Sequence, residues 1–291
     1  MNLTRLRLFH AIEPGDKYWI DEINRTGPDS VLENLLDPHF TANRKSIERI
    51  RERLKVPVDK LVKEITDVGG SFLTENDSNW PHQLQDLITP PIGLVVRGEM
   101  PTCNSVAIVG TRNPTTYGAR ISSEFAAGFA DRGVSVISGG AFGIDTHAHR
   151  GALAAEGKTI AVLASGIAIR YPASNERLFE EILENGALIS EVMPFERARP
   201  ERFLTRNRLI AALARCTIVV EAAFRSGSLR TARDAAELLR IVLAVPGPIN
   251  SPTSDGCHRL IGERCAEIVT SVPDAMEFLV AQPCTLCGDV T

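Results

Sequence analysis

The stretch CTIVVEAAFRSGSLRTARDAAELLRIVLAVP, residues 216–246, contains a complete strand–turn–helix–strand unit. The apolar run 218–220 predicts one buried strand, and the apolar run 241–245 predicts another. Between them, the small-residue turn Ser226-Gly227-Ser228 precedes a helical pattern over 229–239. Two strands joined through a helix need a right-handed crossover and a parallel sheet. The unit therefore predicts an α/β fold.

The turn at 226–228 also favours an anion site. The first N–H groups of a helix lack partners within the helix, and the helix dipole is positive there. Arg206, Asn207 and Arg208 lie just upstream in the sequence. On a helix, residues 206 and 208 point about 200° apart. We therefore expect one of the two arginines to reach a ligand and the other to pack or to dimerise.

From residue 105 onward, short apolar runs alternate with amphipathic helical patterns. This alternation predicts a doubly wound, mostly parallel sheet with helices on both faces. The expected strands are 105–109, 134–137, 159–163 and 187–189, and the expected helices are 117–131, 144–156, 175–184 and 202–214.

The beginning of the chain has a different composition. Residues 1–75 show short amphipathic helical patterns and contain five of the six lysines, which predicts a small helical N-terminal domain. Residues 76–100 contain Trp-Pro and Pro-Pro pairs, and we interpret them as a linker and lead-in with a short strand over 94–97. Residues 101–280 form the expected α/β domain, and 281–291 a C-terminal tail.

Composition excludes several classes of protein. A net charge of −4 over 291 residues argues against a generally basic nucleic-acid binder. Between Glu196 and Arg233, however, there are nine Arg and three acidic residues, a local charge of +6. We therefore expect an anionic partner at one place only. The sequence shows no signal peptide or membrane span, and six scattered cysteines do not form a disulfide framework, so a cytoplasmic location without membrane contact is expected.

Four small-residue loops follow the expected strands, at 110–113, 138–145, 165–166 and 226–228. In a doubly wound sheet such loops converge on the carboxyl ends of the strands, where ligands bind. No G-x-G-x-x-G follows the first strand and no G-x-x-x-x-G-K-[ST] occurs, which argues against a dinucleotide cofactor or NTP hydrolysis. Glycines can also serve close packing of strand and helix. With four arginines nearby, the loops favour a phosphate-binding surface; these are Arg112, Arg206, Arg208 and Arg230.

No catalytic or metal constellation is evident. Glu221 and Asp234 are the acids nearest the 226–228 loop, and we expect both to be solvated or salt-bridged. His147 and His149 do not face each other on a helix. Cys284 and Cys287 form a lone C-x-x-C without two further ligands at similar spacing. We therefore predict no metal and no cofactor, and the role of this cysteine pair stays open.

Five motifs that occur in a fixed order indicate a resemblance to a known protein family, together with Trp-Pro and Pro-Pro segments over 80–98. They are GTRNPTTYG at 110–118, SGGAFGIDTHAHRGAL at 138–153, RFLTRNRLIAAL at 202–213, SGSLRTA at 226–232 and AVPG at 244–247. Across roughly residues 75–270, the chain resembles the DNA-processing protein A (DprA/Smf) family. The resemblance implies an extended Rossmann-like domain, often preceded by a sterile-alpha-like helical domain. It also implies a homodimer that binds single-stranded DNA, protects incoming DNA and loads RecA recombinase in natural transformation, with no cofactor and no established catalytic activity.

The resemblance also implies the DNA-binding residues. Arg112 would contact phosphate, and Arg206 and Arg208 would add positive charge. The full expected set is Gly110, Thr111, Arg112, Ser138, Gly139, Gly140, Phe142, Arg206, Asn207, Arg208, Ser226, Gly227, Ser228 and Arg230. Phe142 departs from the family, which often has Lys or Arg there, and its ring either stacks on a base or packs into the protein. Arg230, where an apolar residue is common, could restore the missing charge.

Two alternatives stay open. The first is a Rossmann-like nucleotide sensor or phosphoribohydrolase-type enzyme, whose P-G-G-x-G-T-x-x-E segment is only partly matched by residues 226–234. The second is an interaction protein with a vestigial pocket.

Overall fold

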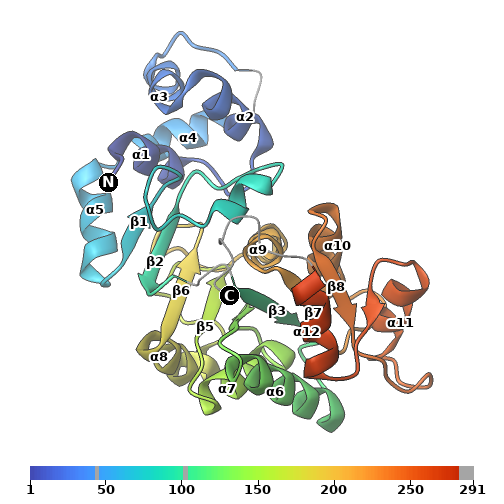
Figure 1. Ribbon diagram of the computed structural model, residues 1–291. Coiled ribbons are helices and arrows are strands. Elements are labelled where there is room, and N and C mark those ends of the chain that lie inside the picture. Colours follow the sequence, from blue (N-terminus) through green and yellow to red (C-terminus); the bar gives the residue numbers. More distant parts are fainter. Residues whose placement is uncertain (43–45, 101–103, 282–291) are drawn as a thin grey trace.

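The computed structural model describes residues 1–42, 46–100 and 104–281. A nine-stranded sheet in the order β1-β2-β6-β5-β4-β3-β7-β8-β9 forms its centre (Figure 1). The strands are β1 (Ser71–Leu73), β2 (Leu94–Gly98), β3 (Ser105–Val109), β4 (Ser135–Ser138), β5 (Thr159–Leu163), β6 (Gly186–Ser190), β7 (Cys216–Val219), β8 (Ile241–Ala244) and β9 (Glu267–Ile268).

The sheet has one point at which the strand order reverses. From β3 the chain moves outward through β4, β5 and β6, and it then returns to place β7 on the other side of β3. Neighbouring strands pair in parallel along the series β6-β5-β4-β3-β7-β8-β9. Strand β2 pairs antiparallel with β6, and β1 pairs antiparallel with β2. The prediction of a doubly wound, mostly parallel sheet is confirmed. A crevice at the carboxyl ends of β3 and β7 follows from this topology.

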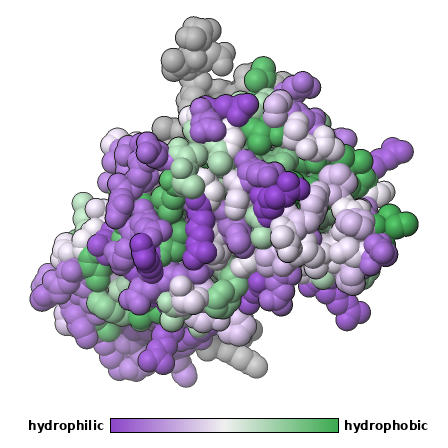
Figure 2. Space-filling model, turned by 90° about the horizontal axis from the view of Figure 1, so that it is seen from below, coloured by the Kyte–Doolittle hydropathy of each residue, from purple (hydrophilic) through white to green (hydrophobic). Residues whose placement is uncertain are grey.

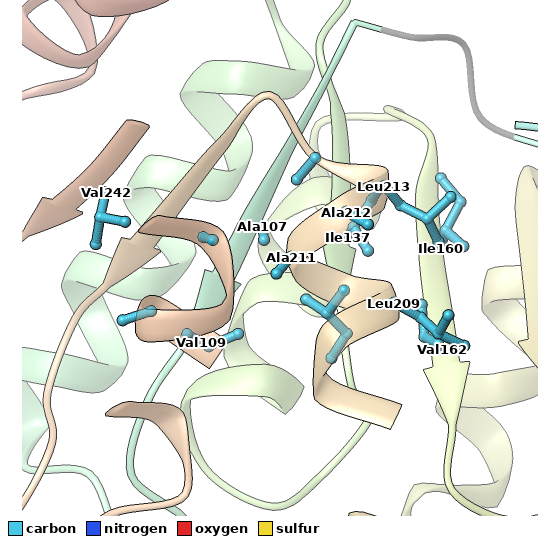
Figure 3. Close-up of a cluster of buried hydrophobic side chains, with 14 of the residues drawn as sticks. Ala107, Val109, Ile137, Ile160, Val162, Leu209, Ala211, Ala212, Leu213 and Val242 are labelled. Carbon is cyan, nitrogen blue, oxygen red and sulfur yellow. The ribbon is translucent and has the colours of Figure 1, made fainter. Parts of the chain in front are cut away.

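Helices cover both faces of the sheet. They are α6 (Thr116–Ala130), α7 (Ile144–Ala154), α8 (Glu176–Glu184), α9 (Pro200–Leu213), α10 (Ser228–Glu237), α11 (Asp255–Gly262) and α12 (Val272–Ala281), with the short 3-10 helices η1 (His82–Asp86) and η2 (Ala173–Asn175). On one face, Leu209, Ala212 and Leu213 of α9 pack against the central strands (Figure 3). This packing fixes the rotation of α9 about its own axis. It therefore decides which polar side chains of α9 face the carboxyl ends of the strands.

Strand β3 shows why the sheet needs cover on both sides. Ala107 and Val109 join the core beneath α9 and α10, whereas Val106 and Ile108 join the core beneath α6, α7 and α12. Alternate residues of a strand point to opposite faces, so a run that is apolar throughout must be buried twice. Seen from below, the molecule is covered mostly by hydrophilic side chains, with hydrophobic groups scattered among them (Figure 2).

The N-terminal part contributes five helices, α1 (Leu3–Ala11), α2 (Lys17–Thr26), α3 (Pro28–Leu36), α4 (Ile47–Leu54) and α5 (Val58–Asp67). Their apolar side chains share one cluster with β1, β2, β5, β6 and α8. Residues 71–73 already belong to the sheet, and the domain boundary at residue 75 stays a prediction. No helix among the described residues is long and apolar enough to cross a membrane.

Candidate functional site

A cavity of about 200 Å³ lies at the switch point of the sheet. The end of β3 and the loop after it form one wall, the loop after β7 forms another, and α9 supplies the third. Its lining is Val109, Gly110, Arg112, Ala141, Asp145, Phe203, Leu204, Arg206, Asn207, Ile210, Ser226, Gly227, Ser228 and Thr231. Three of the small-residue loops predicted from the sequence therefore contribute to one cavity.

Arg206 places a buried cation in this cavity. Its residue surface is only 6% exposed. Its Nη1 donates to the carbonyl oxygen of Gly139 at 2.7 Å and also to that of Val162. Burial lowers the pKa of Arg206 to about 10, an effect that Asp145 opposes and Arg112 reinforces. The guanidinium therefore remains charged at neutral pH, and its Nη2 has no hydrogen-bond partner among the described residues.

Gly139 gives this guanidinium the space it occupies. A Cβ on residue 139 would lie 2.3 Å from Nη1 of Arg206 and 2.6 Å from its Nη2, much closer than van der Waals contact. Any side chain here would push the guanidinium away. The second glycine has a different role, because Gly140 has φ of +67°, a conformation that favours glycine.

Asp145 holds the same loop from the other side. Its Oδ2 accepts hydrogen bonds from the backbone N–H groups of Gly139, at 3.1 Å, and Ala141, at 3.3 Å. It lies in the first turn of α7, where a carboxylate is favoured by the helix dipole. Burial nevertheless raises the pKa of Asp145, while Arg206 acts in the opposite direction. The loop therefore presents its backbone in a fixed shape beside two buried ionisable groups.

Arg112 supplies the exposed cation. Its guanidinium lies over the ring of Phe203, 5.1 Å from the ring centroid. The loop that carries it is anchored through Thr111, whose N–H donates to the carbonyl of Glu221 at 2.6 Å and whose carbonyl accepts from Ile144 at 3.1 Å. The exposed and the buried arginine therefore reach the same cavity from different elements.

Glu221 ties the end of β7 to the start of α6. Its Oε2 accepts from the N–H of Thr115 at 2.9 Å, and its Oε1 accepts from the Thr115 hydroxyl at 2.7 Å. The Thr253 hydroxyl donates to Oε1 at 3.2 Å. These bonds satisfy the buried carboxylate, so Glu221 positions the Arg112 loop and does not face the cavity. The expectation that Glu221 is solvated or salt-bridged is wrong, because the carboxylate is buried and its partners are hydroxyl and amide groups.

The 226–228 loop closes the cavity at the start of α10. The hydroxyls of Ser226 and Ser228 lie 2.7 Å apart, and Nδ2 of Asn207 donates to the carbonyl of Gly227 at 3.3 Å. A Cβ at Gly227 would meet nothing within 4 Å. This loop therefore leaves open space in front of the helix N-terminus.

The predicted residues divide into three groups. Those lining the main cavity are Gly110, Arg112, Arg206, Asn207, Ser226, Gly227 and Ser228. Gly139 and Phe142 line a smaller neighbouring cavity, which Arg112 also borders. Neither cavity is lined by Thr111, Ser138, Gly140, Arg208 or Arg230. Ser138 instead donates its hydroxyl to the carbonyl of Ile108 at 2.6 Å and belongs to the core.

The structure does not bring Arg208 or Arg230 to the site, and these two expectations need correction. Nη2 of Arg208 lies 2.7 Å from Oε2 of the buried Glu191, and Nη1 donates to the carbonyl of Thr89 at 2.6 Å. Arg230 lines neither cavity and pairs with Asp234, with Nε 2.7 Å from Oδ1. The predicted splay of Arg206 and Arg208 is therefore seen, with only Arg206 facing the cavity.

Sequence reasoning missed Asp145, Phe203 and Tyr171. Phe203 borders both cavities, and Tyr171 meets it edge to face at a centroid distance of 5.7 Å. The sequence signal for Phe203 was its place in the first turns of the same helix as Arg206. Within the described ranges no cluster of His, Cys, Asp and Glu suits a metal ion, and Cys284 and Cys287 lie outside those ranges.

The topology and this cavity define a Rossmann-like α/β protein whose switch point carries arginine side chains. The model of the DNA recombination-mediator protein A family matches residues 71–280. The chain belongs to this family, as the motifs had suggested.

Comparisons with individual relatives support this family membership. A putative DNA processing protein DprA from Mycobacterium tuberculosis is 41% identical over 261 residues, 84% of this chain and 64% of that protein. The chain therefore spans less than two thirds of that relative. DNA processing protein A from Streptococcus pneumoniae superposes with a TM-score of 0.79 at 30% identity, covering 95% of this chain and 98% of that one. The Helicobacter pylori protein, whose structure concerns its single-stranded DNA binding mode, gives 0.65 at 30% identity over 73% and 96%.

Proposed function

We propose that this protein binds single-stranded DNA in the main cavity, protects it, and loads RecA recombinase onto it during natural transformation. The observation that carries the proposal is the meeting of Arg112 and Arg206 at the switch point, because guanidinium groups hold phosphate through paired N–H···O bonds. A cavity of about 200 Å³ accepts a phosphate or a single nucleotide and excludes a duplex. The H. pylori relative supports the same ligand.

Salt-dependent binding tests this proposal. Affinity for an oligothymidylate should fall linearly with the logarithm of salt concentration, with each neutralised phosphate contributing about −0.7 to the slope. Duplex DNA and a thymidine mononucleotide are the comparison ligands, and both should bind more weakly. Equal affinity for the duplex, or an affinity independent of salt, would contradict the proposal.

Homodimer formation and the RecA partnership rest on family membership. Light scattering of the purified protein tests the first, and binding of purified RecA to the protein–DNA complex tests the second. A monomer at micromolar concentration, or RecA filaments that form no faster with the protein than without it, would count against these parts of the proposal. The cytoplasmic location stays a prediction.

The enzyme alternative would need an acid in the cavity. Asp145 lines the cavity, but its Oδ2 accepts hydrogen bonds from the N–H groups of Gly139 and Ala141. Asp234, the acid of the partly matched 226–234 segment, pairs with Arg230 and does not line the cavity, although burial raises its pKa. We therefore propose that the protein does not hydrolyse nucleoside monophosphates. Release of free base by the purified protein, lost in Asp234→Asn, would establish the enzyme instead.

A further inference from the structure

The first turns of α9 have no apolar anchor of their own. This part of the helix carries Phe203 and Arg206, which line the main cavity. Of residues 200–205, only Arg202 is buried, and no side chain caps the start of the helix. The apolar residues of α9 that join the core begin at Leu209. Contacts from outside the sheet must therefore hold the cavity end of α9 in place.

The buried Arg202 is held by Glu13, which lies in the loop between α1 and α2. Nε of Arg202 donates to Oε2 of Glu13 at 3.2 Å and Nη2 donates to Oε1 at 3.2 Å, so the pair is bidentate. Nη1 of Arg202 donates to Oε2 of Glu196 at 2.9 Å. Glu13 also pairs with Arg53 of α4 at 3.0 Å. The Glu13 carboxylate therefore ties the α1–α2 loop and α4 to the first turn of α9.

Gly15, two residues further along the same loop, lies directly against α9. A Cβ on Gly15 would be 2.8 Å from Cγ2 of Thr205, closer than van der Waals contact. The φ of Gly15 is +74°, a conformation that favours glycine. The N-terminal helices share one apolar cluster with strands β1, β2, β5 and β6. The loop is therefore fixed to the sheet and packs against α9 one residue before Arg206.

We infer that Glu13 and Gly15 are positioning residues for the cavity. They hold the first turns of α9, and with them Phe203 and Arg206, in the arrangement that binds DNA. This inference rests on the proposed function, and neither positioning residue lines the cavity itself. When only part of the protein population has the competent arrangement, affinity falls in proportion to that fraction. Loosening the loop should therefore lower the affinity for DNA and leave the salt slope unchanged, because no phosphate contact is lost.

Glu13→Gln separates positioning from electrostatics. Removal of a negative charge alone would strengthen the attraction of the protein for a polyanion. Positioning predicts the opposite result, binding of oligothymidylate that is weaker by about 2- to 30-fold, the range for residues that act without touching the ligand. A shallower salt slope would mean that a phosphate contact itself is lost, and tighter or unchanged binding would leave only the charge effect. Either result would overturn the inference.

Glu75→Gln is the matched control. Glu75 also pairs with a buried arginine, but that partner is Arg5 of α1 and not a residue of α9. The side chains of Glu75 and Glu13 are 33% and 23% exposed, and both substitutions remove one negative charge. Glu75→Gln should therefore bind oligothymidylate at least as tightly as the native protein. An equal loss of affinity in both variants would contradict a specific role for Glu13.

Gly15→Ala tests the second contact and allows a rescue. The new Cβ should push against Thr205 and weaken DNA binding. Thr205→Ser removes the Cγ2 methyl and keeps the hydroxyl, which donates to the carbonyl of Glu201 at 3.1 Å. The double variant Gly15→Ala/Thr205→Ser should therefore recover affinity, although the backbone strain at residue 15 remains. A double variant as weak as Gly15→Ala would show that strain, and not contact with α9, causes the loss.

Hydrogen exchange of the DNA-free protein measures the order of α9 without any ligand. Amides over 202–208 should exchange faster in Glu13→Gln than in the native protein or in Glu75→Gln, because local opening becomes more frequent. Equal exchange in all three proteins would overturn the inference. Faster exchange with native DNA affinity would also overturn it, because the order of α9 would then not matter for binding. If the native protein does not bind oligothymidylate, the proposed function fails and the positioning role falls with it, even where exchange shows that Glu13 orders the helix.

Discussion

Nη1 of Arg206 lies 2.7 Å from the carbonyl oxygen of Gly139, and this contact fixes the buried guanidinium at the wall of the cavity. The helix α9 provides the arginine, and the loop after β4 provides the carbonyl. The charge is thereby held in place before any ligand arrives, which lowers the ordering cost of binding.

Gly139→Ala should displace Arg206 while leaving the fold intact. The new Cβ would overlap the end of a flexible side chain, and the φ of residue 139 is not positive. We expect weaker binding of oligothymidylate and a salt slope shallower by about 0.7, one phosphate's share. Gly262→Ala, where a Cβ meets nothing within 4 Å, is the control. Native binding by Gly139→Ala would show that Arg206 takes no part.

Arg208→Ala should act on stability alone. It removes the partner of the buried Glu191, and breaking a buried ion pair costs about 3–5 kcal/mol of unfolding free energy. Replacing both residues by leucine should recover most of that loss, because no charge is then left unpaired. Urea unfolding measures the first effect. The salt slope of the folded double variant should equal that of the native protein. A shallower slope would show that Arg208 contacts DNA.

Glu13 links the N-terminal helices to α9, because its carboxylate pairs with Arg202 at 3.1 Å and with Arg53 at 3.0 Å. Burial acts to raise the pKa of Glu13, but these arginines outweigh it and the pKa is lowered. A depressed pKa stabilises the fold above the unfolded-state pKa, and that contribution is lost as the pH falls through the folded-state pKa. Glu13→Gln should therefore cost about 1–3 kcal/mol at pH 7.

The difference between native protein and Glu13→Gln should shrink as the pH falls below about 4.3, the ordinary value for Glu. Urea unfolding of both proteins from pH 7 down to about pH 2, well below the ordinary pKa of Glu, measures it. A difference that does not change with pH would mean that the charge of Glu13 is irrelevant and only its shape matters.

Phe142→Lys should add a phosphate contact. Phe142 borders the second cavity together with Arg112, so an ammonium group there lies near bound DNA. We expect tighter binding and a salt slope steeper by about 0.7. Phe142→Ala is the matched control and should leave the slope unchanged. If lysine also leaves it unchanged, the second cavity lies outside the path of the DNA.

Much of this arrangement could be predicted from local sequence. Strands 105–109 and 159–163 were predicted to the residue, since each is a continuous apolar run bounded by turn or polar residues. Arg112 could be placed at the carboxyl rim because its loop, which begins at Gly110, directly follows a strand. Which of Arg206 and Arg208 faces the cavity depends on the rotation of α9, and packing of residues such as Leu213 sets that rotation. Strand β1 was missed because three residues carry too little periodicity.

The contact between Tyr171 and Phe203 could not be predicted from the sequence. Each is an ordinary aromatic residue in its own segment, and their contact arises only when the β5 loop and α9 meet at the rim. The role of Asp145 could not be predicted either, because its two hydrogen bonds to backbone N–H groups depend on the shape of the preceding loop.

The salt slope of Arg112→Ala tests the central claim most directly, because Arg112 is the exposed cation of the cavity. The variant should bind oligothymidylate more weakly than the native protein, with a slope shallower by about 0.7. Arg177→Ala, which removes an exposed arginine on α8, should behave as the native protein does. If Arg112→Ala keeps both the native affinity and the native slope, the cavity at the switch point is not where this protein binds single-stranded DNA.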